Sequence, residues 1–504
     1  MPLRLLVAAL AGMALGLAFE PVRLVWLLPV ALAALLWCVR GARLRRGLGL
    51  GFVFGAAFFL VHIVWIGAVG SDAWVALSLF QALYVGVAGA GLAAVSRLRG
   101  WPVWSAAVWV GVEAFRGAWP FGGLTWGRVG FGVLDTPVEG WLPWAGVHGA
   151  GFVVVLVAGL LLWAVLGVRD RPREAALAVA LVAVALTVPW LAQPGRDTDG
   201  TASVGIVQGD VPGSGDNLVA HHREVTRSHV ALTRKLGADV EAGRKPRPDF
   251  VLWPENSTAV DPFADTQARE GIRAAAGAVG VPVLVGGMVD APDPGQVLNQ
   301  GIVWDPVTGP GERYTKRHPV PFGEYIPFRE IIGDWSSERL GLIPRDMVAG
   351  TDKEPLSIAG VEVADLICFD VSYDDVLADQ VRRGAEVVVV QTSNALFIHT
   401  GQIEQQFAIS RVRARETGRT LVVASVNGRS GVVDADGEVV AAIEPRTRAV
   451  LVHEVPLTVG HPPAVVVGPW LGRACVLVAL AAVGWALLPY RRRRAETAGH
   501  GGNQ

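Results

Sequence analysis

Two kinds of hydrophobic pattern alternate along the chain. Residues 1–193 and 466–490 consist of long apolar runs separated by short arginine-rich stretches, whereas residues 194–465 carry short apolar runs among many charges. A helix that crosses a bilayer needs about 20 apolar residues, with a working range of about 17–25. The long runs therefore predict about eight membrane-spanning helices, seven before residue 194 and one after residue 465, at 3–19, 24–39, 48–69, 73–96, 102–116, 146–168, 174–193 and 467–490.

The arginines between these runs predict an orientation, because cytoplasmic loops of membrane proteins are enriched in Arg and Lys. If all eight runs cross the membrane, four arginine clusters fall on one side: Arg40, Arg43, Arg45 and Arg46; Arg97 and Arg99; Arg169, Arg171 and Arg173; and Arg491 to Arg494. We expect this side to be the cytoplasm. Residues 491–504 would then form a cytoplasmic tail, and residues 194–465 would form a domain on the extracytoplasmic face.

The segment 194–465 has the pattern of a layered α/β domain. Short runs bounded by Gly, Pro and Asp predict strands at 202–208, 249–253, 281–286, 301–304, 363–369, 386–391 and 420–426. Helical patterns lie between some of them, at 219–242, 264–279, 373–383 and 402–417. Three later strands, at 430–434, 438–443 and 449–454, predict a meander and hence a mixed sheet.

Composition agrees with this division. Of the 504 residues, 52% are hydrophobic and only 18% are charged, whereas a soluble protein carries about 25% charged residues. The net charge of −1 argues against a nucleic-acid-binding protein. Three cysteines are too few for a disulfide framework. No His, Asp or Glu pair has metal-ligand spacing, so no metal or other cofactor is predicted.

Three residues with reactive side chains lie where buried runs of the α/β domain end: Glu255, Lys316 and Cys368. Each has a simpler interpretation when taken alone. Glu255 could be an acid at a helix N-terminus, Lys316 a solvated surface charge, and Cys368 a small buried apolar residue. Their shared location argues against those interpretations, because ligands of α/β sheets bind at strand ends. Cys368 is also the only cysteine outside the predicted membrane spans. Its domain is expected on the extracytoplasmic face, an oxidising compartment in which an unpaired thiol must be protected or used.

Together the three residues suit acyl transfer through a thioester. A cysteine thiolate is the nucleophile, and a base must remove its proton. Glu255 could be that base, and His318 is a second candidate. The ammonium of Lys316 would stabilise the oxyanion of the tetrahedral intermediate.

The order Glu255, Lys316, Cys368 resembles the catalytic order of the nitrilase (carbon–nitrogen hydrolase) superfamily. The run 316–327, Lys-Arg-His-Pro-Val-Pro-Phe-Gly-Glu-Tyr-Ile-Pro, and the eight-span frame are similar to its apolipoprotein N-acyltransferase branch. The resemblance extends to about residue 490. It implies a polytopic helical membrane domain (1–193 and 466–490) carrying an extracytoplasmic nitrilase-like αββα sandwich (194–465).

The resemblance also implies the reaction and its partners. Glu255 would be the general base, Lys316 the oxyanion stabiliser and Cys368 the nucleophile, with Glu324 as a supporting acid. A phospholipid would donate an acyl chain to Cys368. The acceptor would be the α-amino group of the N-terminal diacylglyceryl-cysteine of an apolipoprotein. The implied location is the bacterial plasma (inner) membrane, with the catalytic domain on the periplasmic side.

Two departures and two alternatives stand beside this interpretation. Phe369 and Asp370 follow the cysteine where many members of the family have Tyr and Glu. Many members also have a tryptophan in an early loop, but none occurs here between Gln208 and Ala220. One alternative is a membrane-tethered nitrilase-type amidase that hydrolyses a small amide. The other is a transporter or receptor, which the scarcity of charges within the predicted spans disfavours.

Overall fold

The structure, a computed structural model of the chain, describes residues 1–332 and 343–499. Contacts divide the chain into two compact units. The helical unit comprises Met1–Pro194 and Val467–Gln504, and the α/β unit comprises Gly195–Val466.

A helix lies at each of the eight predicted spans. The helices are α1 (Pro2–Leu17), α2 (Leu27–Val39), α3 (Leu44–His62), α4 (Ser71–Val95), α5 (Trp101–Arg116), α6 (Leu142–Gly167), α7 (Pro172–Leu191) and α13 (Pro463–Gly499). In the described ranges, five of them are long and apolar enough to cross a membrane: α3, α4, α6, α7 and α13. The α1 and α2 helices are shorter apolar helices, and α5 has 16 residues. The count of eight crossings and their orientation therefore stay predictions.

Close contacts between small residues hold α3 against α4. A Cβ atom at Gly51 of α3 would lie 2.3 Å from the carbonyl oxygen of Val85 and 2.9 Å from the Cα of Gly89 on α4. The backbones of the two helices can approach this closely only because both positions are glycine. Packing of this kind is typical of membrane helices, which gain little from apolar burial against lipid.

The α/β unit contains two mixed sheets. The first has the order β13-β1-β2-β3-β4-β5, with β6 added on β4, and the second has the order β12-β11-β10-β9-β8-β7. The strands of the first sheet are β1 (Asp197–Gln208), β2 (Phe250–Leu252), β3 (Val283–Asp290), β4 (Gln296–Asp305), β5 (Gly309–Thr315), β6 (Asp346–Met347) and β13 (Ala449–Val459). Those of the second are β7 (Leu356–Ile358), β8 (Val361–Ile367), β9 (Val387–Thr392), β10 (Leu421–Ser425), β11 (Ser430–Val433) and β12 (Val439–Ile443).

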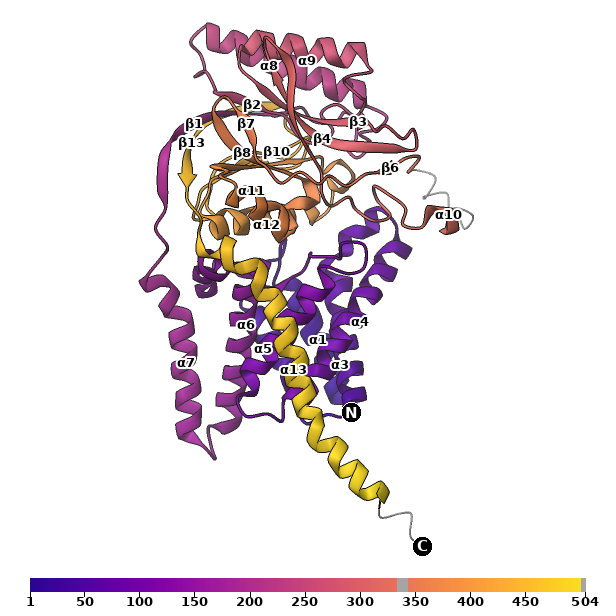
Figure 1. Ribbon diagram of the computed structural model, residues 1–504, viewed down its shortest axis with the longest axis vertical. Coiled ribbons are helices and arrows are strands. Elements are labelled where there is room, and N and C mark those ends of the chain that lie inside the picture. Colours follow the sequence, from indigo (N-terminus) through magenta and orange to yellow (C-terminus); the bar gives the residue numbers. More distant parts are fainter. Residues whose placement is uncertain (333–342, 500–504) are drawn as a thin grey trace. The chain divides into compact units, whose positions relative to one another are not determined.

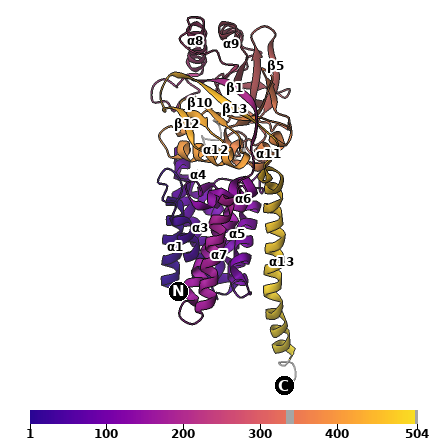
Figure 2. The ribbon, with the colours of Figure 1, turned by 90° about the vertical axis from the view of Figure 1, so that its left-hand side faces the viewer.

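Helices cover the outer face of each sheet (Figures 1 and 2). The α8 (His222–Glu241) and α9 (Thr266–Val279) helices lie on the first sheet, where Leu236 and Ile272 pack with Trp253 in one apolar core. The α11 (Asp374–Arg382) and α12 (Gln402–Thr417) helices lie on the second sheet, and α10 (Arg329–Ile332) is a single turn. The inner faces of the sheets meet, giving the four layers of the predicted αββα sandwich.

The sequence pattern located most elements but missed or misplaced several. The predicted meander is wrong for its last strand. Strands β11 and β12 pair in the second sheet, but β13 pairs with β1 in the first sheet. The strand predicted at 363–369 ends at Ile367, so Cys368 begins a short 3₁₀ turn, Cys368–Ser372. Strand β5 is mostly polar, and β6 and β7 have only two and three residues, so the periodicity did not reveal them.

Candidate active site

Glu255 lies just past the end of β2 and is held between the two sheets. Its side chain is 4% exposed. The side-chain amide of Asn299 on β4 donates a hydrogen bond to Oε1 at 2.8 Å, and the backbone N–H of Ser393, just past β9, donates to Oε2 at 2.9 Å. Each sheet therefore fixes one oxygen of the carboxylate.

A glycine behind Glu255 lets the chain turn closely against β3. A Cβ atom at Gly286 would lie 2.2 Å from the carbonyl oxygen of Pro254 and 2.7 Å from the Cα of Glu255. The position of the carboxylate thus depends on a residue without a side chain in the neighbouring strand.

Lys316 follows β5 directly and is fully buried. Its ammonium Nζ lies 2.6 Å from Glu324 Oε1 and 3.5 Å from Glu255 Oε1. The second oxygen of Glu324 accepts a hydrogen bond from the backbone N–H of Val320 at 2.8 Å. The loop after Lys316 therefore folds back and places its own carboxylate on the lysine.

These carboxylates determine the charge of the lysine. Burial alone would lower the pKa of Lys316, but the charges of Glu324 and Glu255 outweigh it and hold the pKa well above its usual value. Burial, and then the charge of Glu255, raises the pKa of Glu324, while Lys316 opposes that rise. The lysine is therefore a fixed cation at neutral pH.

Cys368 follows the end of β8 with a positive φ of 54°. A residue with a side chain adopts this left-handed conformation at a cost, and such positions cluster at functional sites. The residue is partly exposed, and its Sγ accepts a long hydrogen bond of 3.8 Å from the side-chain amide of Gln406 on α12. The sulfur is thus presented at a sharp turn between a strand and a helical turn.

The surroundings of Cys368 keep its thiol protonated at rest. Burial, followed by the charges of Glu255 and Glu324, raises its pKa to about 12, and the positive charge of Lys316 opposes that rise. A thiol with this pKa is a weak nucleophile until a base removes its proton. The cluster therefore needs general-base assistance, which Glu255 can supply.

His318 does not serve Cys368 in this structure, contrary to the second sequence hypothesis. Its ring stacks on Tyr373 with centroids 3.8 Å apart, and its Nε2 lies 3.0 Å from Asp375 Oδ1. The imidazole is held by Tyr373 and Asp375, which leaves Glu255 as the candidate base.

Asp370 joins the segment of Cys368 to the segment of Lys316. Its buried carboxylate accepts hydrogen bonds from the Tyr314 hydroxyl at 2.9 Å and from the backbone N–H of His318 at 3.0 Å. These partners lie two residues before and two residues after Lys316. Burial raises the pKa of Asp370, and the nearby charges of Lys316 and His318 oppose that rise.

Sequence reasoning missed the polar residues behind the sulfur. Gln406 Oε1 accepts hydrogen bonds from the side chains of Asn394 at 2.6 Å, Thr392 at 3.2 Å and Gln402 at 3.2 Å. Two signals were available: 391–394 is a polar run at the end of a buried strand, and Gln402 and Gln406 share one helix face at i, i+4 spacing. This network fixes the amide that contacts the sulfur.

The arrangement has the parts of covalent acyl transfer in one place. It provides a thiol at a turn, a buried carboxylate, and a buried ammonium that faces the same carboxylate. A carbonyl carbon attacked by the sulfur would develop negative charge on its oxygen, which the ammonium can stabilise.

Two family patterns match the chain. Residues 11–160 match the apolipoprotein N-acyltransferase N-terminal domain, and residues 202–460 match the carbon-nitrogen hydrolase family. The first falls in the helical unit and the second in the α/β unit.

Several known proteins are similar to this chain over most of their length. An apolipoprotein N-acyltransferase of Mycolicibacterium smegmatis is 34% identical, with 95% of this chain and 84% of that protein covered. The apolipoprotein N-acyltransferase of Methylococcus capsulatus is 29% identical, with 99% and 98% covered. That of Chromobacterium violaceum is 29% identical, with 89% and 87% covered.

Proposed function

The chain belongs to the apolipoprotein N-acyltransferase family, and we propose that it transfers the acyl group through a thioester on Cys368. Relatives that carry both domains are lipoprotein acyltransferases, so the chain is an acyltransferase of lipoprotein biosynthesis, and the amidase alternative is not favoured. The observation that carries the mechanism is that the buried ammonium of Lys316 contacts both Glu255 and Glu324. The charges of all three groups act on the thiol of Cys368.

The first half-reaction loads the enzyme. Glu255 takes the thiol proton of Cys368, and Sγ attacks the ester carbonyl carbon of a phospholipid. The oxyanion that forms is stabilised by Lys316. When the intermediate collapses, the carbon–oxygen bond breaks, the lysophospholipid leaves with the proton held by Glu255, and a thioester remains.

The second half-reaction delivers the acyl chain. The α-amino group of the diacylglyceryl-cysteine of an apolipoprotein attacks the thioester carbonyl. Glu255 accepts a proton from the amine, the carbon–sulfur bond breaks, and Cys368 recovers its proton as the thiol. The product is an N-acyl amide, so the lipoprotein becomes triacylated.

The proposed location is the bacterial plasma membrane, with the α/β unit on the extracytoplasmic face. The five membrane-length helices support a membrane location. The arginine clusters support the orientation, because they fall on one side if all eight apolar helices cross the membrane. Both substrates are anchored in the membrane, which explains why an enzyme for this reaction carries so many apolar helices.

Mass spectrometry of the intact, full-length protein tests the mechanism. After incubation with phosphatidylethanolamine vesicles, we expect a single acyl adduct on Cys368 that hydroxylamine removes. The C368S variant should lack the adduct, whereas C475S, which alters a cysteine of α13, should keep it. The K316M variant should remain folded and fail to load. A folded wild-type protein without an adduct would contradict the thioester, and normal loading of K316M would remove Lys316 from the mechanism.

A further inference from the structure

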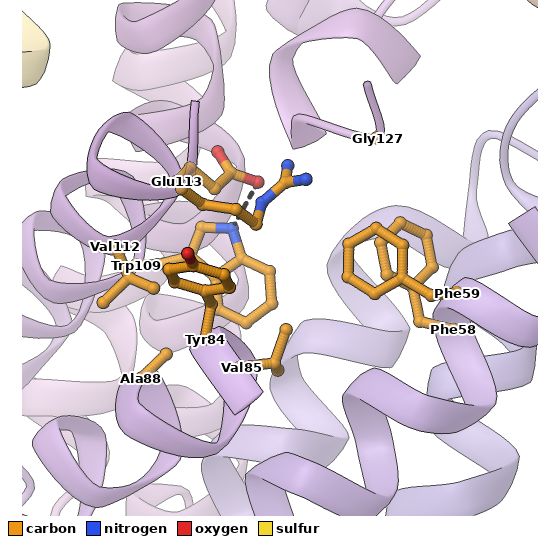
Figure 3. A pocket seen from close by; sticks show the side chains of 10 residues that line it. Phe58, Phe59, Tyr84, Val85, Ala88, Trp109, Val112, Glu113 and Gly127 are labelled. Carbon is orange, nitrogen blue, oxygen red and sulfur yellow. Dashed lines mark hydrogen bonds between the residues drawn. The ribbon is translucent and has the colours of Figure 1, made fainter. Parts of the chain in front are cut away.

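Asp365 of β8 is a fully buried acid that the proposed chemistry does not use. Both of its carboxyl oxygens lack a hydrogen-bond partner within the described residues. Other buried carboxyl groups of the chain do accept hydrogen bonds. Figure 3 shows one of them in the helical unit, where the indole N–H of Trp109 donates to Glu113 at 2.9 Å. The others in the described ranges are Asp210, Asp239, Glu255, Asp370, Asp379 and Glu416.

Gln391, on the neighbouring strand β9, presents an acceptor of its own. Its side-chain Nε2 donates to the carbonyl oxygen of Trp253 at 2.6 Å. If the amide were turned round, its oxygen would face that carbonyl oxygen, and two acceptors would repel each other. The amide oxygen Oε1 therefore points away from Trp253. It is buried, and no donor in the described part of the chain reaches it.

Gly301 of β4, in the facing sheet, shows that these acceptors meet. A Cβ atom at Gly301 would lie 1.9 Å from Asp365 Oδ2 and 2.8 Å from Gln391 Oε1. Both oxygens thus occupy the space that a side chain at this position would fill. Two buried acceptors without a donor repel each other, whereas one proton between them makes a hydrogen bond. The carboxyl group is the one of the two that can carry this proton.

The charges around Asp365 favour the neutral acid. Burial, and then the charge of Asp370, raises the pKa of Asp365 well above its usual value. Tyr314 of β5 is also in its charge environment. The adjacent strands β7 and β9 carry no titratable residue. Charged residues of the other neighbours, α11 and β4, have partners of their own: Asp374 with Arg413, Asp375 with Arg317, Asp379 with Arg382, and Asp305 with the backbone N–H of Thr308.

We propose that Asp365 is a positioning residue that is protonated at neutral pH, so that its Oδ2 donates a hydrogen bond to Gln391 Oε1 and fixes the amide that holds Trp253. Trp253 lies two residues before Glu255. Ser393, two residues after Gln391, donates its backbone N–H to Glu255 Oε2 at 2.9 Å. The neutral acid therefore steadies both segments that position the carboxylate of Glu255. Its effect on loading rests on the proposed role of Glu255, whereas its protonation does not.

Infrared spectroscopy of the full-length protein in detergent micelles tests for the proton. The spectrum of wild type minus D365N at pH 7 should contain the C=O band of a protonated carboxyl group. Wild type minus D352N, which alters an exposed aspartate, should contain carboxylate bands instead. Carboxylate bands in both differences would overturn the proposal, and a water molecule bridging an ionised Asp365 to Gln391 would give that result. D365N should fold, because its amide supplies the same donor at the same size, so an unfolded D365N would also contradict the proposal.

The pH dependence of unfolding measures the same proton. A carboxyl group with a raised folded pKa contributes stability that is fully present below its unfolded pKa and is lost as pH rises. Between pH 5 and pH 7, the equilibrium constant for urea unfolding of the wild type should therefore rise about tenfold per pH unit relative to D365N. An equal pH dependence in the two proteins would show that Asp365 is ionised in the folded state.

Acyl loading of Cys368 tests the positioning role. D365N should load within about twofold of wild type, whereas D365A leaves Gln391 Oε1 without a donor and should load about tenfold more slowly. The control V387A shortens another fully buried side chain of this sheet, on β9, and should load normally.

Thermal unfolding shows which variants are folded. Normal loading of D365A, or equal slowing of D365A and V387A, would refute the positioning role. If D365A does not fold, D365N decides, since tenfold slower loading by folded D365N would refute it as well. A wild type that does not load would contradict the proposed function alone, because the infrared and unfolding measurements need no acyl group.

Discussion

The Lys316 ammonium lies 2.6 Å from the Glu324 carboxylate, and the lysine side chain has no exposed surface. The two residues stand eight positions apart, on one loop that begins where β5 ends. Because Val320 donates its backbone N–H to the second oxygen of Glu324, the loop holds the carboxylate on the lysine. This pair sets the charge on which oxyanion stabilisation depends.

Removing the charge of Glu324 should impair acyl loading. E324Q keeps the shape of the side chain but loses one of the two carboxylates that hold Lys316 protonated. We expect the rate of acyl-Cys368 formation, measured by mass spectrometry, to fall at least tenfold, because hydrogen bonds to charged groups contribute about 1.5–3 kcal/mol. The control E330Q alters an exposed glutamate of α10 and should load normally. Equal rates in the two variants would exclude Glu324 from a supporting role.

The raised pKa of Cys368 predicts how alkylation depends on pH. With a pKa of about 12 instead of 9, the folded thiol ionises only at high pH, so labelling by iodoacetamide should keep rising up to pH 10. In the urea-unfolded chain it should level off above pH 9. K316M removes the cation that opposes the shift and should label more slowly at each pH. Peptide mass spectrometry separates Cys368 from Cys38 and Cys475, and a plateau near pH 7 in the folded protein would disprove the predicted environment.

The same shift affects stability. A thiol whose folded pKa is raised contributes its full stabilisation below the unfolded pKa, near 9, and loses it as pH rises toward 12. Unfolding by urea at pH 8 and pH 10 should therefore show a larger loss of stability for wild type than for C368S. An equal loss in the two proteins would contradict this expectation.

A methyl group at Gly286 should displace Glu255. In G286A the new Cβ atom would overlap the backbone of Pro254 and Glu255, so we expect a loss of stability of about 1–3 kcal/mol and at least tenfold slower acyl loading. The matched control is G277A, because Gly277 on α9 has open space around its Cβ position. That variant should be neutral or slightly stabilised. Thermal unfolding and loading are measured on both, and unimpaired loading of G286A would show that Glu255 is not positioned by this contact.

Asp370 should act by positioning the loop of Lys316. D370N can no longer accept with both oxygens from Tyr314 and His318, and we expect loading to fall about tenfold. D370E keeps two acceptors and should recover most of the activity. D352N changes an exposed aspartate and serves as the control. If D370E is no better than D370N, the carboxylate does not act through these hydrogen bonds.

Asp265 should stabilise the α/β unit without affecting chemistry. Its side chain caps α9 by accepting from the backbone N–H of Ala268 at 2.8 Å, and this bond, followed by that from Arg223, lowers the pKa of Asp265. D265A should cost about 1 kcal/mol, whereas D265N should retain most of the cap. Because the pKa is lowered, this stabilisation is present above the unfolded pKa and is lost as pH falls through the folded pKa. Urea unfolding of the two variants at pH 7 and in acid measures both effects.

The sequence determined the division of the chain and the identity of the candidate residues. Long apolar runs cannot be accommodated without a bilayer or a large buried core, so the eight helices could be located from hydropathy alone. Glu255, Lys316 and Cys368 could be chosen because each follows a strand or matches a family order. The apolar runs and the strand ends are local signals, because each can be recognised within one short segment of the chain.

Only the tertiary structure decided which groups contact one another. The carboxylate of Glu255 is fixed by Asn299 and by Ser393, which lie 44 and 138 positions later in the chain. No pattern within one segment encodes such contacts, because they arise from the packing of two sheets. The same reason explains why His318, two residues after Lys316, contacts Asp375, and why β13 pairs with β1 instead of completing the expected meander.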